Sequence, residues 1–243
     1  MASPAAPLST AESSAARPDG PAERKWVRWL EVCLVLFFAF GTNFYNSLYL
    51  LIHGPTAELR TTAARATFGL LHEIMALALL GYVLARRGRR FSDIGLRWSL
   101  RDLGVGVAIL IAAVAASVVG GVSIYFLHIR IFGTAPVPHR GSDFFGHFSI
   151  PIAPYFLVGP VFEELVVRAY LMTEIRELTG SAALAVVAST VVQTSYHLYY
   201  GWWIALSLGC SFFVLSLYYA RSRRALPVLV AHELFDLQAL FRL

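Results

Sequence analysis

Charged residues are scarce in this chain. They make up only 14% of its 243 residues, whereas hydrophobic residues make up 57% and the mean hydropathy is +0.62. An ordinary soluble domain has about a quarter of its residues charged, so this composition excludes one. Cysteine is scarcer still: Cys33 and Cys210 both lie in apolar segments, where cysteine behaves as a small hydrophobic residue and says nothing about redox compartment. The sequence predicts an integral membrane protein.

Seven apolar runs are long enough to cross ~30 Å of hydrocarbon, which takes about 20 residues of helix. They lie near residues 27–52, 66–85, 103–127, 152–176, 181–199, 202–220 and 225–242. These runs lack the strict alternation of polar and apolar residues that marks the strands of a membrane barrel. We therefore expect an all-α, polytopic membrane bundle of about seven transmembrane helices.

Two other segments differ in composition from these runs. Residues 1–24 are rich in Ala, Ser and Pro and lack the apolar stretch of a signal peptide, so we expect a disordered cytoplasmic tail. Residues 128–150 mix Gly, Pro and Phe, which predicts an interfacial loop that could act as a lid. A single membrane domain over 25–243 is expected, with its motifs within about 151–240.

Basic residues are distributed unevenly between the connections. Fourteen lysine and arginine residues lie near the start of the first run, at the end of the fourth, or in the connections after the second and sixth runs, which all fall on one side of the membrane. Five lie on the other side. The positive-inside rule then places the N-terminus in the cytoplasm. The net charge of +5 reflects this orientation, so no nucleic-acid partner is expected. We interpret the chain as a protein of the bacterial inner membrane.

The fourth apolar run contains two adjacent glutamates and an arginine. A charged side chain near the bilayer centre costs roughly 2.5–3.5 kcal/mol on insertion scales, so such residues usually face an enclosed polar cavity. Residues four apart share a helical face, so Glu164 can pair with Arg168, whereas Glu163 points about 100° away and can face the cavity. Pro160 predicts a break or restart of the helix, which would put Glu163 near a helix N-terminus.

Two later runs contribute further polar residues. His197 ends the fifth run with Gln193 one turn before it, and His232 and Asp236 share a face of the seventh. A glutamate with two histidines can activate water and stabilise an oxyanion, which suffices to hydrolyse an amide without a serine or cysteine nucleophile. We therefore expect a site between the fourth, fifth and seventh helices, with Glu164, Arg168 and Gln193 in supporting roles.

These motifs resemble those of a known family. The EExxxR run from Glu163 to Arg168, a histidine ending the next helix (His197) and an HxxxN/D run (His232 and Asp236) are similar to the CPBP family. This family comprises CAAX proteases and bacteriocin-processing enzymes and is also called the ABI family. The resemblance spans about residues 160–236.

The resemblance implies a glutamate-type intramembrane endopeptidase that needs no metal or cofactor. It would cut a membrane-associated protein or peptide near its C-terminus or membrane junction. Glu163 and His197 would activate water, and His232 with residue 236 would stabilise the oxyanion. The chain departs from the family pattern at two positions: Gln193 replaces a usual phenylalanine, and Asp236 replaces the asparagine of the best-known branch. An ionised aspartate only accepts hydrogen bonds, so Asp236 could instead orient His232.

Two other functions remain open from the sequence. A zinc metalloprotease could use His197, His232 and Asp236, because His232, Glu233 and Asp236 partly match the HExxH pattern. A membrane protein that binds a partner or confers immunity without catalysis is the second. Another polar pair, His72 and Glu73, lies in the second run and is expected either to pack or to support the residues that form the site.

Overall fold

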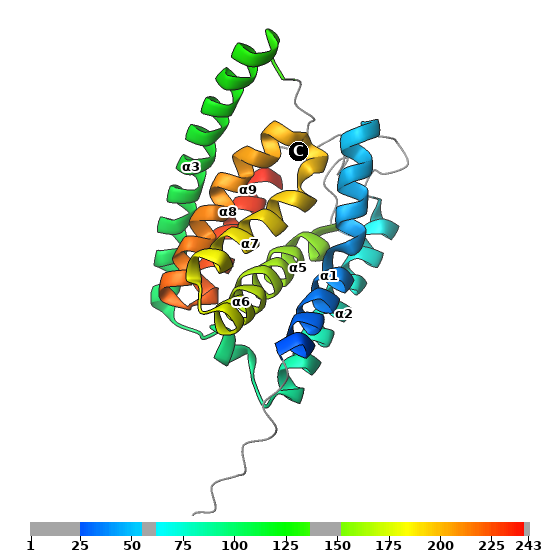
Figure 1. Ribbon diagram of the computed structural model, residues 1–243, viewed down its shortest axis with the longest axis vertical. Helices are drawn as coiled ribbons and strands as arrows, with labels where there is room; N and C mark the ends of the chain where they lie inside the picture. The colour runs from blue at the N-terminus through cyan, green and yellow to red at the C-terminus, as the bar shows by residue number, and fades with distance from the viewer. Residues whose placement is uncertain (1–24, 55–61, 137–151, 241–243) are drawn as a thin grey trace, which may run out of the picture.

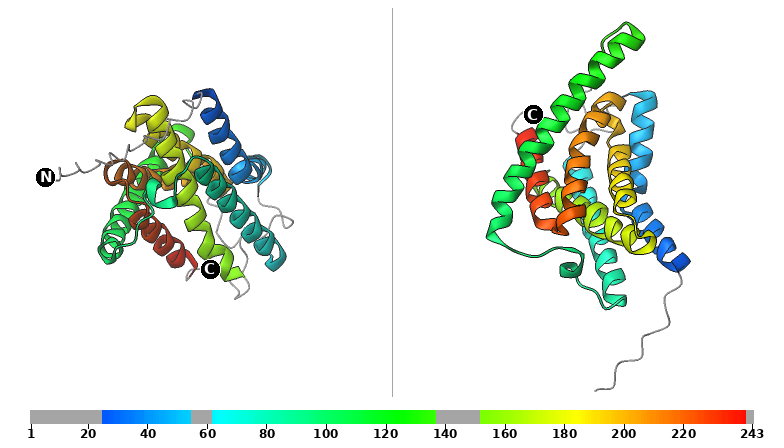
Figure 2. Two further views of the ribbon diagram at one scale, coloured as in Figure 1. Left: turned by 90° about the horizontal axis from the view of Figure 1, so that it is seen from below. Right: turned by 60° about the vertical axis from the view of Figure 1, so that its left-hand side comes forward.

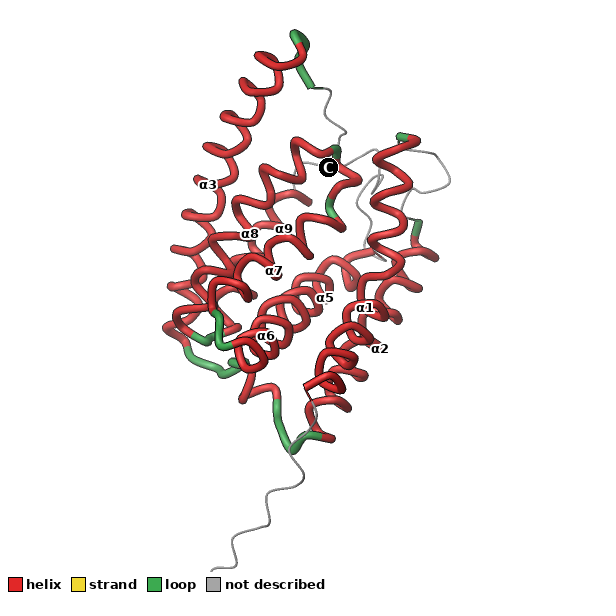
Figure 3. Tube along the Cα trace, in the orientation of Figure 1, coloured by secondary structure: helices red, strands yellow, loops and turns green. Residues whose placement is uncertain are grey.

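The computed structural model describes residues 25–54, 62–136 and 152–240, and every structural statement below concerns these residues. Figure 3 shows helices joined by short loops throughout this part, with no strand in it. The elements are α1 (Lys25–His53), α2 (Ala63–Arg86), η2 (Phe91–Ile94), α3 (Leu100–Phe132), α5 (Ala153–Glu163), η4 (Glu164–Leu171), α6 (Met172–Thr179), α7 (Ala182–Tyr196), η5 (Leu198–Tyr200), α8 (Trp202–Ser222) and α9 (Ala225–Leu240).

All seven predicted runs are helical, so the expected all-α bundle is confirmed. The fourth run is divided into α5, the π-helix η4 and α6, which follow one another without a loop. Four helices, α1, α2, α3 and α8, are long and apolar enough to cross a membrane. By contrast, α7 has 15 residues and, at 1.5 Å per residue, is only about 22 Å long.

The helix α3 is longer than predicted. It continues to Phe132, five residues beyond the expected end of the third run, and stops at Gly133, whose φ of 72° is a left-handed conformation that glycine adopts without strain. The first part of the predicted interfacial loop is therefore helical. The rest of that loop, from 137, and the predicted tail over 1–24 lie outside the described residues.

The helices form two groups with a central segment between them (Figure 1). On one side α1 packs against α2, and on the other α3 packs against α8 and α9. The segment α5–η4–α6 runs between the groups, and α7 packs against α8 and α6. Figure 2 shows the same arrangement from two further directions, with α3 extending beyond its neighbours. The segment that carries Glu163, Glu164 and Arg168 is thus the central one.

The π-helix η4 forms the centre of the core. All of its eight residues are buried, including Glu164 and Arg168. Its apolar members Val166 and Tyr170 belong to one hydrophobic cluster with Phe40 of α1, among others. Two charged side chains are therefore held at the most enclosed part of the molecule. A π-helical turn inside an α-helix often marks a functional site.

The break predicted at Pro160 is wrong. Helix α5 continues through Pro160 to Glu163, and the irregular geometry begins only at Glu164. Proline removes a single backbone donor, and the helices packed around a membrane segment can hold it straight despite that loss. Glu163 consequently lies inside a continuous helical segment and not near a helix N-terminus.

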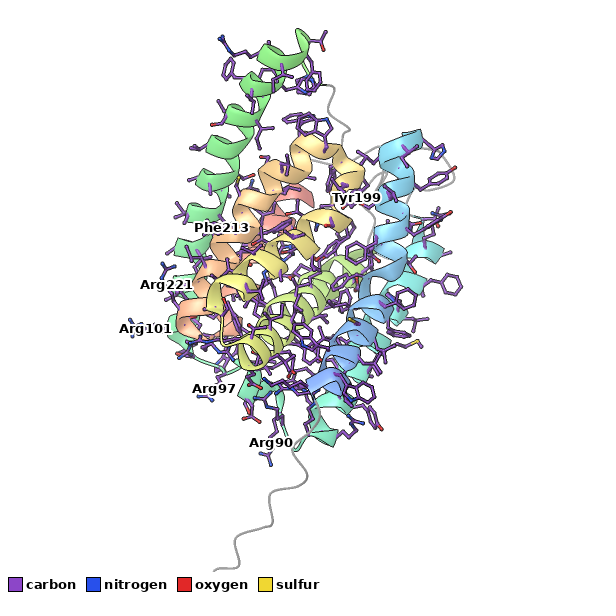
Figure 4. All side chains as sticks on the ribbon, in the orientation of Figure 1. Arg90, Arg97, Arg101, Tyr199, Phe213 and Arg221 are labelled. Carbon is purple, nitrogen blue, oxygen red and sulfur yellow. The ribbon has the colours of Figure 1, made fainter. Side chains whose placement is uncertain are left out.

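The arginine-rich connections lie toward one end of the bundle. Figure 4 shows Arg221, Arg101 and Arg97 one below the other along the left edge and Arg90 at the bottom of the bundle, whereas Tyr199 lies higher. Arg90, Arg97 and Arg101 lie at or between the ends of α2 and α3, and Arg221 lies in the last turn of α8. Residues from separate parts of the sequence thus give one end of the bundle its positive charge.

Candidate active site

Glu163, at the end of α5, faces helix α7. Its Oε2 atom accepts two hydrogen bonds of 2.8 Å, one from Nε2 of Gln193 and one from the hydroxyl of Tyr196. Both hydrogen bonds use the same carboxylate oxygen, and the side chain of Glu163 is only partly buried. The carboxylate is therefore held in one orientation while Oε1 stays available to another donor.

Glu164 points in a different direction from Glu163 and contacts α9. Its Oε1 atom lies 3.2 Å from Nη1 of Arg168 and accepts a 2.8 Å hydrogen bond from Nδ1 of His232. The side chains of Glu164 and Arg168 are both fully buried. The predicted pairing of these two residues is present, and it also fixes His232, which the spacing alone did not predict.

His197 directly follows the last residue of α7. Its Nδ1–H donates a 2.8 Å hydrogen bond to the backbone carbonyl of Gln193, one turn earlier. The imidazole ring packs against Tyr196 and Phe212, with centroid distances of 4.8 and 4.9 Å. In the neutral ring the other nitrogen, Nε2, is then an acceptor. The hydrogen bond to the backbone therefore selects the neutral tautomer in which Nε2 is the atom that can accept a proton.

His232 and Asp236 lie one turn apart on α9. Nε2 of His232 is 3.8 Å from Oδ1 of Asp236, which is too long for a hydrogen bond but close enough for electrostatic attraction. The aspartate side chain is 35% exposed, against 6% for the histidine. The imidazole of His232 is thus placed between two carboxylates, Glu164 at Nδ1 and Asp236 beyond Nε2.

The predicted site residues come together from the predicted helices. Glu163, Glu164 and Arg168 come from α5 and η4, Gln193 from α7, His197 from the residue that follows α7, and His232 and Asp236 from α9. Both histidines are near enough to Glu163 for their charges to interact with it. The result is a compact polar cluster in which one carboxylate faces two imidazoles.

Two contributors were missed by sequence reasoning. Tyr196 donates to Glu163, and its position three residues after Gln193, on the same helical face, is a signal that could have identified it. Phe212 of α8 lies under Arg168, with the guanidinium carbon 5.5 Å from the ring centroid. No sequence motif marks Phe212, because its role depends on how α8 crosses η4.

The polar pairs outside the motifs are placed differently. His72 donates a 2.8 Å hydrogen bond through Nε2 to the backbone carbonyl of Phe38, which ties α2 to α1. Glu73 is buried beside α5, and Glu233 is partly buried on α9. Within the described ranges, no group of three His, Cys, Asp or Glu side chains is arranged to hold a metal ion.

Comparison with known proteins finds one family model that matches part of the chain. Residues 145–238 match the family model described as type II CAAX prenyl endopeptidase, Rce1-like. No curated protein and no solved structure matches the chain. The matched range contains all three motifs and every residue of the polar cluster. Residues 145–238 of this helical membrane bundle are therefore similar to the CAAX-type endopeptidases of the CPBP family.

Proposed function

We propose that this protein hydrolyses a peptide bond within the membrane by means of water activated by Glu163. The substrate is a membrane-associated protein or peptide, cut near its C-terminus or its membrane junction. The observation that supports this most directly is the pair of hydrogen bonds from Gln193 and Tyr196 to one oxygen of Glu163. They orient the carboxylate and leave Oε1 to accept a proton from water.

The reaction then follows from the roles of the remaining groups. Glu163 takes a proton from water, the hydroxide attacks the carbonyl carbon, and His197, through Nε2, helps to orient the water. The carbonyl oxygen becomes an oxyanion, which Nε2–H of His232 stabilises. The C–N bond breaks as Glu163 returns its proton to the leaving amine.

His232 must donate through both ring nitrogens to act in this way. Its Nδ1–H is already donated to Glu164, so Nε2–H is the donor for the oxyanion. Carboxylates on both sides of the ring balance the charge of the resulting imidazolium. Asp236 is assigned here to orient and neutralise His232, because an aspartate offers no donor to an oxyanion.

The orientation of the chain sets which substrates reach the site. We place the tail over 1–24 and the arginine-rich end in the cytoplasm, in a bacterial inner membrane. His197 and Tyr199 then lie nearer the outer face, which favours a leader, a bacteriocin-like peptide or the anchor of an exported protein. Cysteine introduced at Arg97 should be labelled from the cytoplasm, and cysteine introduced at Arg140 from outside. Labelling of Arg140→Cys from the cytoplasm alone would exclude this orientation.

A comparison of protein termini in native membranes tests the catalytic proposal. Membranes from cells that express the wild type, Glu163→Gln or the distant control Glu177→Gln at equal levels are profiled for new N- and C-termini. We expect cleavage products with the wild type and the control, and at least about a 100-fold loss with Glu163→Gln. Identical termini in all three samples would favour a non-catalytic binding protein. Loss of the products on adding a zinc chelator would favour the metalloprotease.

A further inference from the structure

A buried carboxylate next to the site has no assigned role. Glu73 of α2 is only 7% exposed, and its Oε2 atom has no hydrogen-bond partner among the described residues. Leaving such a group unpaired in a membrane protein is costly, so polar residues at this depth are usually functional. Glu73 therefore requires an explanation beyond packing.

The way α2 crosses α5 places this carboxylate. A Cβ atom at Gly69 would come within 2.6 Å of Cε2 of Tyr155, so the tyrosine ring occupies the space that the glycine leaves. One turn further along both helices the glycine is on α5 and the larger side chain, Glu73, is on α2. There a Cβ atom at Gly159 would lie 3.6 Å from Oε1 of Glu73. The carboxyl group of Glu73 thus lies at ordinary packing distance from α5 at Gly159.

That contact brings Glu73 close to the reacting groups. Gly159 and Glu163 are four residues apart and share a face of α5, so Glu73 lies one turn from the carboxylate that activates water. The charges of Glu73 and Glu163 are near enough to interact. Tyr155, which packs one turn before Gly159, is also near enough to interact with Glu73, Glu163 and Asp236. Glu73 therefore belongs to the wall of the same site.

Among the described residues, none of the site's cations pairs with Glu73. Arg168 lies 3.2 Å from Glu164, and His232 lies between Glu164 and Asp236. Burial without a partner favours the uncharged form of a carboxyl group, whereas a positively charged ligand beside it favours the charged form.

We propose that Glu73 forms a subsite for a cationic side chain of the substrate, lysine or arginine, beside the bond to be cut. This inference rests on the proposed function, since it assigns a binding role within the same site. A lysine or arginine stem can lie along apolar walls while its head reaches a carboxylate. The free Oε2 atom of Glu73 is the acceptor for that head group.

Binding to full-length protein in lipid nanodiscs tests the subsite without relying on cleavage. The background is Glu163→Gln, and the probes are an apolar peptide with one central lysine and the same peptide with Nε-acetyl-lysine. We expect the lysine peptide to bind at least about tenfold more tightly. Adding Glu73→Gln should abolish this difference, whereas Glu73→Asp and the distant Glu177→Gln should keep it.

Each outcome of this experiment decides something. Equal binding of the two peptides to the Glu163→Gln protein would overturn the subsite, and this result does not depend on whether Glu73→Gln folds. A preference for lysine that survives Glu73→Gln would also overturn it. Cleavage of the same peptides by the wild type is measured separately. A lysine preference lost in Glu73→Gln, together with no cleavage by the wild type, would support the subsite and count against the proposed catalytic function.

Discussion

Two buried charge clusters in this molecule are built differently. At the arginine-rich end, the fully buried Glu174 of α6 is bonded through both oxygens. Its Oε2 accepts hydrogen bonds of 2.7 Å from Arg28 and from Arg87, and its Oε1 accepts one of 3.3 Å from Arg89. In the site, the fully buried Arg168 lies 3.2 Å from Glu164, but none of its three side-chain nitrogens makes a hydrogen bond within the described part.

The difference separates a structural cluster from the proposed active site. Arg28 and Arg89 are 20% and 27% exposed, so they neutralise Glu174 while staying partly hydrated, and the cluster ties α1 and α2 to α6. The site instead leaves buried polar atoms without partners, among them Oε2 of Glu164, Oε1 of Gln193 and Oε2 of Glu73. Unpaired polar groups at this depth raise the energy of the empty site, and a bound substrate can lower it.

Removal of the site's arginine should have the largest effect on stability. Arg168→Leu leaves Glu164 with only His232 as a buried counter-charge, and breaking a buried ion pair costs about 3–5 kcal/mol. We expect a loss of that size in the free energy of unfolding, measured by denaturant titration in detergent. Arg168→Lys, which keeps the charge, should lose less. A change below about 1 kcal/mol for Arg168→Leu would show that His232 alone balances Glu164.

Disruption of the structural cluster should have a smaller effect and leave catalysis intact. Glu174→Gln removes the charge that three arginines share, and hydrogen bonds to charged groups are worth about 1.5–3 kcal/mol. We expect a loss of about 2 kcal/mol by the same titration, with unchanged cleavage per folded molecule. The matched control Glu177→Gln, at a side chain that is 33% exposed, should lose less than about 1 kcal/mol. Loss of cleavage in folded Glu174→Gln would contradict the separation of the two clusters.

The smallest expected change concerns a partly exposed carboxylate of the site. Asp236→Asn removes the charge 3.8 Å from Nε2 of His232 without changing the size of the side chain. We expect cleavage to fall about tenfold, equivalent to about 1.4 kcal/mol of transition-state stabilisation, with an unchanged unfolding midpoint. Asp236→Leu should fall by a similar factor. Full activity in Asp236→Asn would show instead that an amide serves as oxyanion donor at this position.

Much of the fold was predictable because the bilayer constrains it. Each of the seven apolar runs became helical, since only internally bonded helices satisfy backbone groups in lipid when closed barrels are excluded. The predicted positions failed where tertiary packing overrode a local signal or where the local signal was weak. Pro160 suggested a break that the packed neighbours of α5 prevent, and the end of α3 was placed too early because the residues after 127 look less apolar.

By itself, the sequence determined which polar groups lie within the apolar helices and which of them share a helical face. Helical spacing separated Glu163 from Glu164 and placed His232 on the same face as Asp236, because these relations depend only on the period of one helix. Contacts between helices were decided by the tertiary structure. The bonds of Glu163 to Gln193 and Tyr196, the bond of Glu164 to His232, and the placing of Glu73 against Gly159 all depend on how separate helices cross. Helical periodicity fixes directions around one axis, whereas crossing positions are set by side chains that interlock from both partners.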